Sequence, residues 1–376
     1  MRIGSDGWED RAAPSSNEGR PRFDARNRHS RMCRLKRAAH RAIDGGGGMA
    51  QGSLVKRGSG GMVIYRSFRN TDPPLLAELL RAHVGRIDLP SHVTVDLLEQ
   101  LVFAKLYFDY DGLILACEGE RLLGFVHAGF GTDPAGDRLD RRIGVIAWLL
   151  MRPDAATPEL AGELIQQAEA YLRQRGAQRL IAGSLRPNCP FYAGILGLAE
   201  PPGVSQFDEL FERALLSLGF HPQLRTITHQ RTLPDFEAPI DRRQMEIRRR
   251  MIVEATVDVP TRTWWEACLW NEFELTRLDA MPRGSKQPAA SAVFRALEAA
   301  GFSAAYRGAG LIDITVDENY RRRGLAVYLL SEACRQFSRQ GMTHLFALVR
   351  TGDLPAEGLL AKVGFKPVFH GTLYEK

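Results

Sequence analysis

Three arginines and a glycine stand together at residues 321–324, directly before an apolar helical pattern. The first amide N–H groups of a helix have no intrahelical acceptor, and the helix dipole makes that end electropositive. Arg321, Arg322 and Arg323 at this end repel one another and the helix dipole. A bound anion would offset this repulsion. Gly324 has no Cβ, so its backbone allows an anion to approach closely. The pattern predicts an anion-binding turn that suits a pyrophosphate, with a solvated basic turn as the alternative.

The segments on either side of this turn would hold it in place. The segment LIDITV at 311–316 is typical of a buried strand. The residues after Gly324 have an apolar stripe spaced by about one helical turn, so this helix is expected to face a sheet. The stripe consists of Leu325, Leu329, Leu330, Ala333, Cys334 and Phe337.

The order of strand, turn and helix occurs twice. When Leu160 is placed on Leu325, Gly176 falls on Gly341, and the segment 145–151 falls on 310–316. Downstream, LGFHP at 218–222 matches VGFKP at 363–367. The first copy has additional residues near the Pro/Gly-rich stretch 186–206, which we call the insert. Two copies of one α/β unit are therefore predicted.

The fold class expected is α/β, in an α+β layered form, with two tandem domains that each have a mixed central sheet flanked by helices. We expect the first domain at 62–235 and the second at 236–376. Residues 1–61 carry 13 Lys or Arg against 6 Asp or Glu, are rich in glycine and have few apolar residues. This segment is expected to be a disordered basic tail, or to precede the true start of the protein.

Charge and cysteine usage narrow the class of protein. The formal net charge is +6, and the tail alone carries this excess, so the rest of the chain is close to neutral. This argues against a nucleic-acid-binding protein. The five cysteines are scattered without paired spacing, which indicates a reducing, cytoplasmic location and no zinc site. No apolar run reaches the roughly 18 residues of a membrane helix.

The segment RRRGLA at 321–326 resembles the acyl-CoA pyrophosphate motif of the GNAT N-acetyltransferases, (Arg/Gln)-x-x-Gly-x-(Gly/Ala). Arg321, Gly324 and Ala326 hold its three defining positions. The later DLPAEGLLAKVGFKPV resembles the closing helix and strand of the family, and the tandem arrangement is similar to that of mycothiol synthase and other double GNAT proteins. The resemblance implies an N-acyltransferase that moves an acetyl group from acetyl-CoA to an amine of a small molecule or a protein, without a metal.

The resemblance also implies roles for individual residues of the second copy. Backbone groups of Ile314, Thr315 and Val316 would pair with the pantetheine arm of CoA. The diphosphate would lie on the turn and the first helical residues. Together with the arginines, this donor site comprises Arg321, Arg322, Arg323, Gly324, Leu325, Ala326 and Val327.

The catalytic groups depart from the family pattern. The position of the usual acid, a tyrosine, holds Leu360, so Tyr374 is considered in its place. Asp313 is the candidate general base, because a carboxylate inside a buried strand is costly unless it is partnered or functional. A structural, hydrogen-bonded aspartate is the alternative. A non-catalytic CoA-binding module is the alternative for the whole protein.

The first copy departs further from the motif. Ala156 replaces the motif arginine and Glu159 replaces its first glycine, so a diphosphate would meet a carboxylate. Trp148 stands where the second copy has Asp313. We therefore expect a degenerate copy with a structural or acceptor-binding role. The insert is expected either to line the acceptor site or to be a surface excursion, and the tryptophans of 263–270 to pack in a core or domain interface.

Overall fold

The computed structural model describes residues 54–57, 62–83, 85–90, 92–234, 236–239, 241–297 and 307–376. Most of the predicted tail, residues 1–53 and 58–61, lies outside these ranges. Residues 54–57 form strand β1 (Leu54–Arg57), which pairs antiparallel with β2 (Met62–Ser67). The expectation of an unstructured tail up to residue 61 is wrong for this strand, because its backbone bonds to the edge of the sheet.

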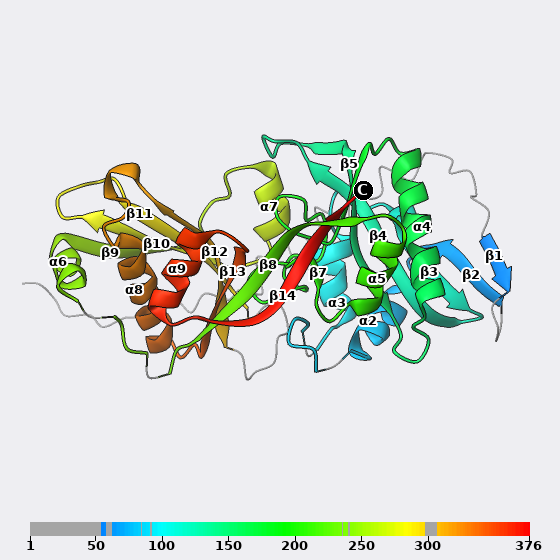
Figure 1. The fold of residues 1–376 in the computed structure, drawn as a ribbon, viewed down its shortest axis with the longest axis horizontal. Helices are drawn as coiled ribbons and strands as arrows, with labels where there is room; N and C mark the ends of the chain where they lie inside the picture. The colour runs from blue at the N-terminus through cyan, green and yellow to red at the C-terminus, as the bar shows by residue number, and fades with distance from the viewer. Residues whose placement is uncertain are drawn as a thin grey trace, which may run out of the picture. The chain divides into compact units, whose positions relative to one another are not determined.

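The first copy has the predicted alternation of strands and helices (Figure 1). Helix α4 (Pro158–Gln174) begins after Thr157, whose hydroxyl accepts a bond from Leu160 N, and is followed by Gly176 with a φ of +99°. A side-chain cap at the start and a glycine with positive φ after the end are common helix boundaries. The other elements are α2 (Pro73–Arg81), α3 (Val95–Leu98), η1 (Glu99–Phe103), η2 (Tyr110–Gly112), β3 (Leu113–Glu118), β4 (Arg121–Thr132), β5 (Leu139–Met151), β6 (Arg179–Ala182), β7 (Val204–Ser205), α5 (Glu209–Ser217) and β8 (His221–Thr232).

The second copy follows the same order after one additional helix, α6 (Arg242–Arg250). Its helix α8 (Leu325–Arg339) buries every residue of the predicted apolar stripe. The other elements are β9 (Met251–Val257), α7 (Trp264–Trp270), β10 (Leu275–Pro282), β11 (Ala290–Ala296), β12 (Gly308–Val316), η4 (Glu318–Tyr320), β13 (His344–Arg350), α9 (Leu354–Val363) and β14 (Lys366–Glu375).

The strand register confirms the internal repeat residue by residue. In the first copy, Ile143–Ile146 of β5 pair in parallel with 179–182 of β6, and in the second copy 308–311 pair with 344–347. Each pairing is shifted by the same number of positions as Leu160 and Leu325. In each copy, one residue has no opposite number in the antiparallel partner strand. This residue is Ala147 of β5 in the first copy and Ile312 of β12 in the second. These two β-bulges occupy equivalent positions.

The last strand of each copy pairs with strands of the other copy. Strand β8 pairs with β13, and β14 pairs with both β8 and β6. Figure 1 shows β8 and β14 running side by side between the two groups of helices. One sheet therefore runs through both copies, in the order β1-β2-β3-β4-β5-β6-β14-β8-β13-β12-β11-β10-β9.

The insert is largely buried, so the surface excursion, one of the two expectations for it, is wrong. Residues 189–205 are all buried, and Phe191, Tyr192, Ile195 and Leu196 share one hydrophobic core with the tryptophans of α7. This bears out the prediction that the tryptophans serve packing. A second anchor is the fully buried Arg295 of β11, which donates to the carbonyls of Leu198 and Ala199 at 3.2 Å each. The insert of the first copy thus packs into the second.

Candidate functional site

Strands β12 and β13 of the second copy part beyond Leu311 and Ala347, where their parallel pairing ends. Strand β12 continues to Val316 and β13 continues to Arg350. The β-bulge at Ile312 stands at the start of this gap. A bulge kinks a strand and increases its local twist, so it helps to turn β12 away from its neighbour. The expected pantetheine-binding residues Ile314, Thr315 and Val316 lie on the parted segment.

The bulge also decides which side chains face which side of the sheet. Leu311, Ile314 and Val316 pack against the core under α8. The consecutive residues Ile312 and Asp313 both line a cavity of about 230 Å³, and Ile312 belongs to the core that contains α7. A regular strand would send neighbouring side chains to opposite faces. The irregular strand therefore brings Asp313 to the α7 side of the gap.

The turn before α8 has the backbone shape that an anion site needs. Arg322 and Gly324 have φ values of +61° and +86°, and Gly324 is the N-cap residue, without a side chain that caps the helix. Arg321 is engaged with its own turn, because its Nε donates to Val316 O at 3.1 Å and its Nη1 to Glu318 at 3.2 Å. Arg322 and Arg323 are exposed and make no hydrogen bond or ion pair with other described residues. They remain the cations available to a phosphate.

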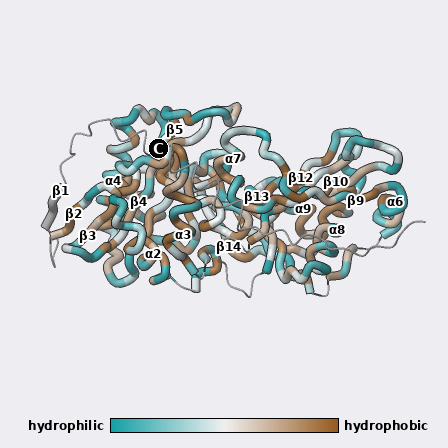
Figure 2. Tube along the Cα trace, turned by 180° about the vertical axis from the view of Figure 1, so that it is seen from behind, coloured by the Kyte–Doolittle hydropathy of each residue, from teal (hydrophilic) through white to brown (hydrophobic). Residues whose placement is uncertain are grey.

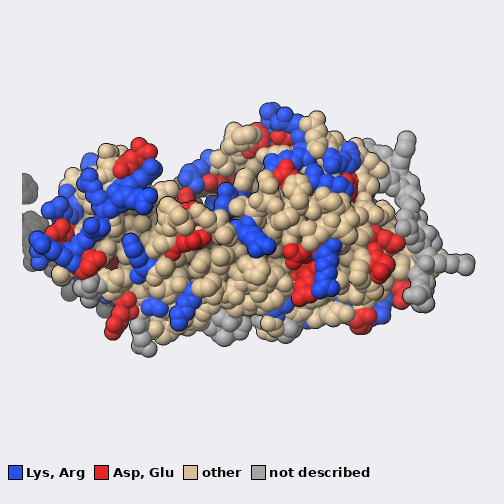
Figure 3. All heavy atoms as spheres, in the orientation of Figure 1, with Lys and Arg blue, Asp and Glu red and all other residues tan. Residues whose placement is uncertain are grey.

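Helix α6 covers Gly324, which corrects the reason given for this glycine. A Cβ at residue 324 would lie 3.1 Å from both Arg243 Cδ and Gln244 Nε2, and Gln244 donates to Gly324 O at 3.2 Å. Gly324 is thus needed for its positive φ and for the approach of α6, rather than for a bare face toward an anion. Helix α6 is itself hydrophilic and basic, and Figures 2 and 3 show its teal trace and the Lys and Arg side chains gathered at that end of the second copy. The helix adds positive charge beside the turn.

Asp313 has an arginine partner in the cavity. Its side chain is about one-third exposed, and Arg262 Nη2 lies 3.6 Å from Oδ2. The same guanidinium bonds to Glu266 at 2.9 Å. Burial acts to raise the pKa of Glu266, but the side chain and backbone amide of Arg262 donate to it and lower its pKa overall. The cavity lining therefore has two carboxylates, which share Arg262, and two further arginines, Arg186 and Arg277, which pair with Glu200 and Asp279.

Arg186, from the insert of the first copy, lies across the parted strands. Its Nη2 donates to Ile312 O at 2.6 Å and to Glu200 at 2.9 Å, while its Nε lies 2.9 Å from the second oxygen of Glu200. Its own carbonyl accepts a bond of 3.3 Å from Arg350, at the end of β13. Burial raises the pKa of Glu200, although the positive charges of Arg186 and Arg295 act against this shift.

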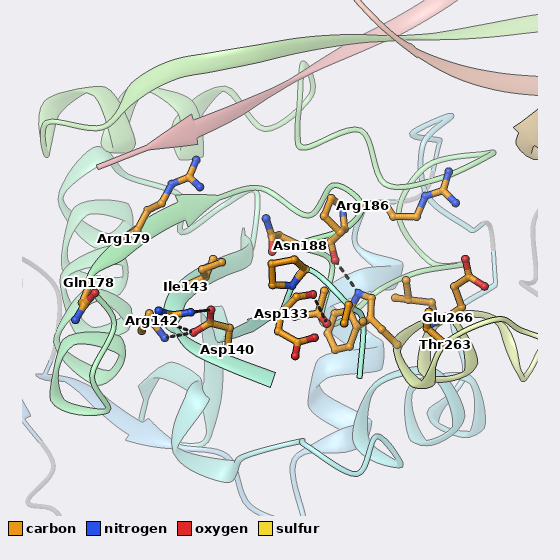
Figure 4. Close-up of a pocket in the computed structure, with 17 residues that line it drawn as sticks. Asp133, Asp140, Arg142, Ile143, Gln178, Arg179, Arg186, Asn188, Thr263 and Glu266 are labelled. Carbon is orange, nitrogen blue, oxygen red and sulfur yellow. Dashed lines mark hydrogen bonds and ion pairs between the residues drawn. The ribbon is translucent and has the colours of Figure 1, made fainter. Parts of the chain in front are cut away.

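A second, larger cavity of about 650 Å³ adjoins the first, because Arg186 and Glu266 line both. Figure 4 shows it between the start of β5, the insert and α7, with the indole of Trp265 bonded to the carbonyl of Pro187 at 2.7 Å. Its walls come from both copies. At its far end Arg142 lowers the pKa of Asp140 to about 2.

The equivalent gap in the first copy is filled by its own chain. Beyond Ile146 and Ala182, Gly183 N donates to Ile146 O at 2.9 Å, and Ser184 Oγ donates to the carbonyl of the bulge residue Ala147 at 3.2 Å. Trp148 is 1% exposed and packs edge-on against Tyr192 at 5.1 Å. The N-terminus of α4 is capped by Thr157 and carries Glu159 in its first turn. These features agree with a degenerate copy.

The remaining catalytic candidate, Tyr374, and the position of the family acid, Leu360, are not among the residues that line the cavity. Tyr374 is 2% exposed, pairs with Ala182 of the first copy, and donates to Glu212 of α5. Burial and this carboxylate raise its pKa. The exchange of β14 places it in the core of the first copy, so the structure does not bring it to Asp313. Leu360 is buried in the core under α8.

Sequence reasoning missed Arg186, Glu200 and α6 as parts of this region. The register of β12 could be read from the repeat, but no pattern in the first copy indicates that its insert reaches the second. The one available signal is the carboxylate of Glu200 within the apolar segment ILGLAEPPG at 195–203, since a buried carboxylate needs a partner.

Comparisons with known proteins agree with this architecture. The model of the acetyltransferase (GNAT) family matches residues 86–197 and 252–365, which together exceed half of the chain. The chain therefore belongs to the GNAT family, with two tandem GNAT domains. No curated protein matches its sequence. Among the described residues, no helix is long and apolar enough to cross a membrane, and no group of three or more His, Cys, Asp or Glu could hold a metal.

Solved structures share the fold at low sequence identity. A glucosamine N-acetyltransferase region of a fungal multi-domain β-N-acetylglucosaminidase has a TM-score of 0.61 and 16% identity, over 88% of this chain and 39% of that one. A tandem GNAT protein from the clavulanic acid biosynthesis pathway has a TM-score of 0.58 and 12% identity, over 84% and 98%. A GNAT protein from Sphaerobacter thermophilus has a TM-score of 0.54 and 15% identity, over 84% and 95%.

Proposed function

We propose that the protein transfers an acetyl group from acetyl-CoA to an amine, and that the second copy carries out this reaction. The observation that supports the proposal most is the parted pair β12 and β13. This gap has the uncapped N-terminus of α8 with its arginines at one side and a cavity with Asp313 on the other face of the sheet. A donor and an acceptor can thus meet from opposite sides.

The donor residues fit an acyl-CoA in charge and backbone shape. Arg322 and Arg323, together with the free amides of the first turn of α8, would hold the diphosphate through charge-assisted bonds. The parted segment 314–316 offers backbone groups that would pair with the pantetheine arm as an added strand would. Acetyl-CoA supplies the activated acyl group. Helix α6 would flank the diphosphate, because it already contacts Gly324.

Asp313 is the proposed proton acceptor. A free alkylamine has a pKa of roughly 10, so an acceptor enters as an ammonium ion and must lose a proton before it attacks a thioester. The Asp313 carboxylate faces the cavity, where it would pair with the ammonium and receive that proton, directly or through water. Formation of the N–C bond then releases the CoA thiolate, which has a modest proton affinity and can leave without the family tyrosine.

The test is transfer of labelled acetyl from acetyl-CoA to a panel of amines by the full chain. An amino sugar belongs in the panel because one structural neighbour is described as a glucosamine N-acetyltransferase; a polyamine, an amino acid and a lysine peptide complete it. We expect label in one class of amine and release of one thiol per acetyl transferred. Binding of acetyl-CoA without transfer to any amine would contradict the proposal.

A non-catalytic CoA-binding module is the second candidate. Leu360, a side chain that cannot donate a proton at the position of the family acid, favours it. The same panel separates the two functions, since a binding module gives heat with acetyl-CoA in calorimetry and no labelled product.

A further inference from the structure

The insert of the first copy contacts the backbone at the point where β12 and β13 part. Arg186 bonds to Ile312 O, and the next residue along β12 is Asp313. Arg186 also reaches β13, because its carbonyl accepts from Arg350. One residue of the first copy is therefore bonded to both strands that border the gap of the second.

Two of the three guanidinium nitrogens of Arg186 are fixed. Nε and Nη2 form a bidentate pair with the carboxylate of Glu200, which is 6% exposed and lies in the same insert. A planar guanidinium held at two points has little freedom to rotate. The bond from Nη2 to Ile312 O therefore comes from a rigid donor, and the pair holds the bulged backbone at a set place.

A β-bulge leaves its extra residue without a ladder partner, so the carbonyl of Ile312 needs another donor. In the first copy the bulge carbonyl of Ala147 accepts from Ser184, a residue of its own copy. In the second copy the donor comes from the other copy. The second domain thus does not complete its own gap.

We infer that the first copy is retained because its insert completes the reaction centre of the second: Arg186, locked by Glu200, is a positioning residue that holds the backbone of Ile312 and so places the Asp313 carboxylate. The inference rests on the proposed function. Displacing a reacting group by about 1 Å can cost on the order of 100-fold in rate. Loss of Arg186 should therefore lower turnover, although Arg186 itself is not proposed to contact CoA.

The experiment compares Arg186→Ala, Arg186→Lys and the wild type for kcat, for KM and for affinity toward acetyl-CoA. We expect Arg186→Ala to lose about 10- to 100-fold in kcat, with acetyl-CoA affinity within about twofold of the wild type. Lysine can bond to the carbonyl but cannot fork onto Glu200, so Arg186→Lys should recover part of the loss. Equal kcat for Arg186→Ala and the wild type would overturn the inference.

Two further variants separate positioning from general damage. Arg66→Ala breaks a similar bidentate pair with the buried Asp72, at 2.7 and 2.8 Å, in the first copy and away from the gap. It should leave kcat unchanged in the folded fraction. The double variant Arg186→Met with Glu200→Leu removes the pair without leaving a lone buried carboxylate. It should stay as slow as Arg186→Ala, and recovery of wild-type kcat would overturn the inference.

Amide hydrogen exchange decides the inference even when no amine is acetylated. In Arg186→Ala, but not in Arg66→Ala, the amides of 312–316 should exchange at least about tenfold faster, because the bulge has lost its hydrogen bond from Arg186. Faster exchange together with an inactive wild type would refute the proposed function, but it would support the role of Arg186 in holding the backbone of Ile312. Unchanged exchange would refute the role of Arg186 in holding this backbone, whatever the activity of the wild type.

Discussion

The two copies have the same gap between equivalent strands, and they treat it in opposite ways. In the first copy Trp148 and Ser184 fill the gap, and Thr157 caps the neighbouring helix. In the second copy the position of Trp148 holds Asp313, which lines a cavity, and the helix begins at Gly324 without a side-chain cap. A few local residues therefore distinguish the two gaps, although the strand register around them is equivalent.

The difference also bears on the contribution that a copy with a filled gap makes to the other copy. The insert that closes the first gap continues into the second copy, where Arg186 bonds to the bulge. The exchanged strands β8 and β14 keep the two copies in one sheet. A filled gap in one copy is thus compatible with a structural contribution to the other.

The largest expected effect is the loss of turnover when Asp313, the second-copy equivalent of Trp148, is replaced. Asp313→Ala should lower kcat by roughly 10²- to 10⁴-fold, the usual contribution of a general base. Because Asp313 is partly exposed and its partner Arg262 is largely exposed, the free energy of unfolding should change by less than about 1 kcal/mol. Steady-state kinetics and urea unfolding measure the two quantities. Full activity of Asp313→Ala would remove this residue from the mechanism.

The equivalent change in the first copy should have the opposite result. Trp148→Ala removes a fully buried side chain and should cost about 3–5 kcal/mol in the free energy of unfolding. Acetyl-CoA affinity of the folded fraction should remain within about twofold, since this gap is filled without a ligand. Urea unfolding together with calorimetry at low temperature tests both statements. A large loss of affinity at unchanged stability would mean that the first gap binds the donor.

A smaller effect concerns acid stability, which should depend on the first copy. Burial lowers the pKa of His127, the cross-strand partner of Trp148, to about 3. Unfolded His127 takes up a proton below pH 6.5 whereas the folded protein does not, so stability should fall as pH drops from about 6.5 toward 3, by about 2 kcal/mol at pH 5.

The variant His127→Val tests this, because Val293 holds the equivalent place in the second copy, opposite Asp313. Its free energy of unfolding should fall less steeply over this pH range than that of the wild type. The exposed His92→Val is the control and should keep the wild-type slope. An unchanged slope for His127→Val would show that folding does not lower the pKa of His127.

Much of the fold follows from the sequence because local patterns carry it. The apolar stripe of α8 depends on residues within a few turns of one another, and the matching of the two copies depends on short local motifs; both are confirmed. The turn of Arg322 and Gly324 was predicted for the same reason.

The remaining features depend on contacts between distant segments. Nothing in the pattern of β14 indicates that it pairs with β6, so Tyr374 was expected near the second-copy site and lies in the first copy. The contact of α6 with Gly324 and the bond from Arg186 to Ile312 likewise join segments that are far apart in the chain. Spacing along one strand or helix cannot reveal such pairs.

Calorimetric titration with acetyl-CoA tests most directly the claim that only the second gap receives the donor. The account predicts one site per chain. The double variant Arg322→Glu with Arg323→Glu should weaken binding by about 100-fold or more, since two charge-assisted contacts become repulsive. The control, Arg138→Glu with Arg141→Glu, reverses two exposed first-copy charges and should bind as the wild type does. Two sites per chain, or one site with unchanged affinity in the first double variant, would contradict the account.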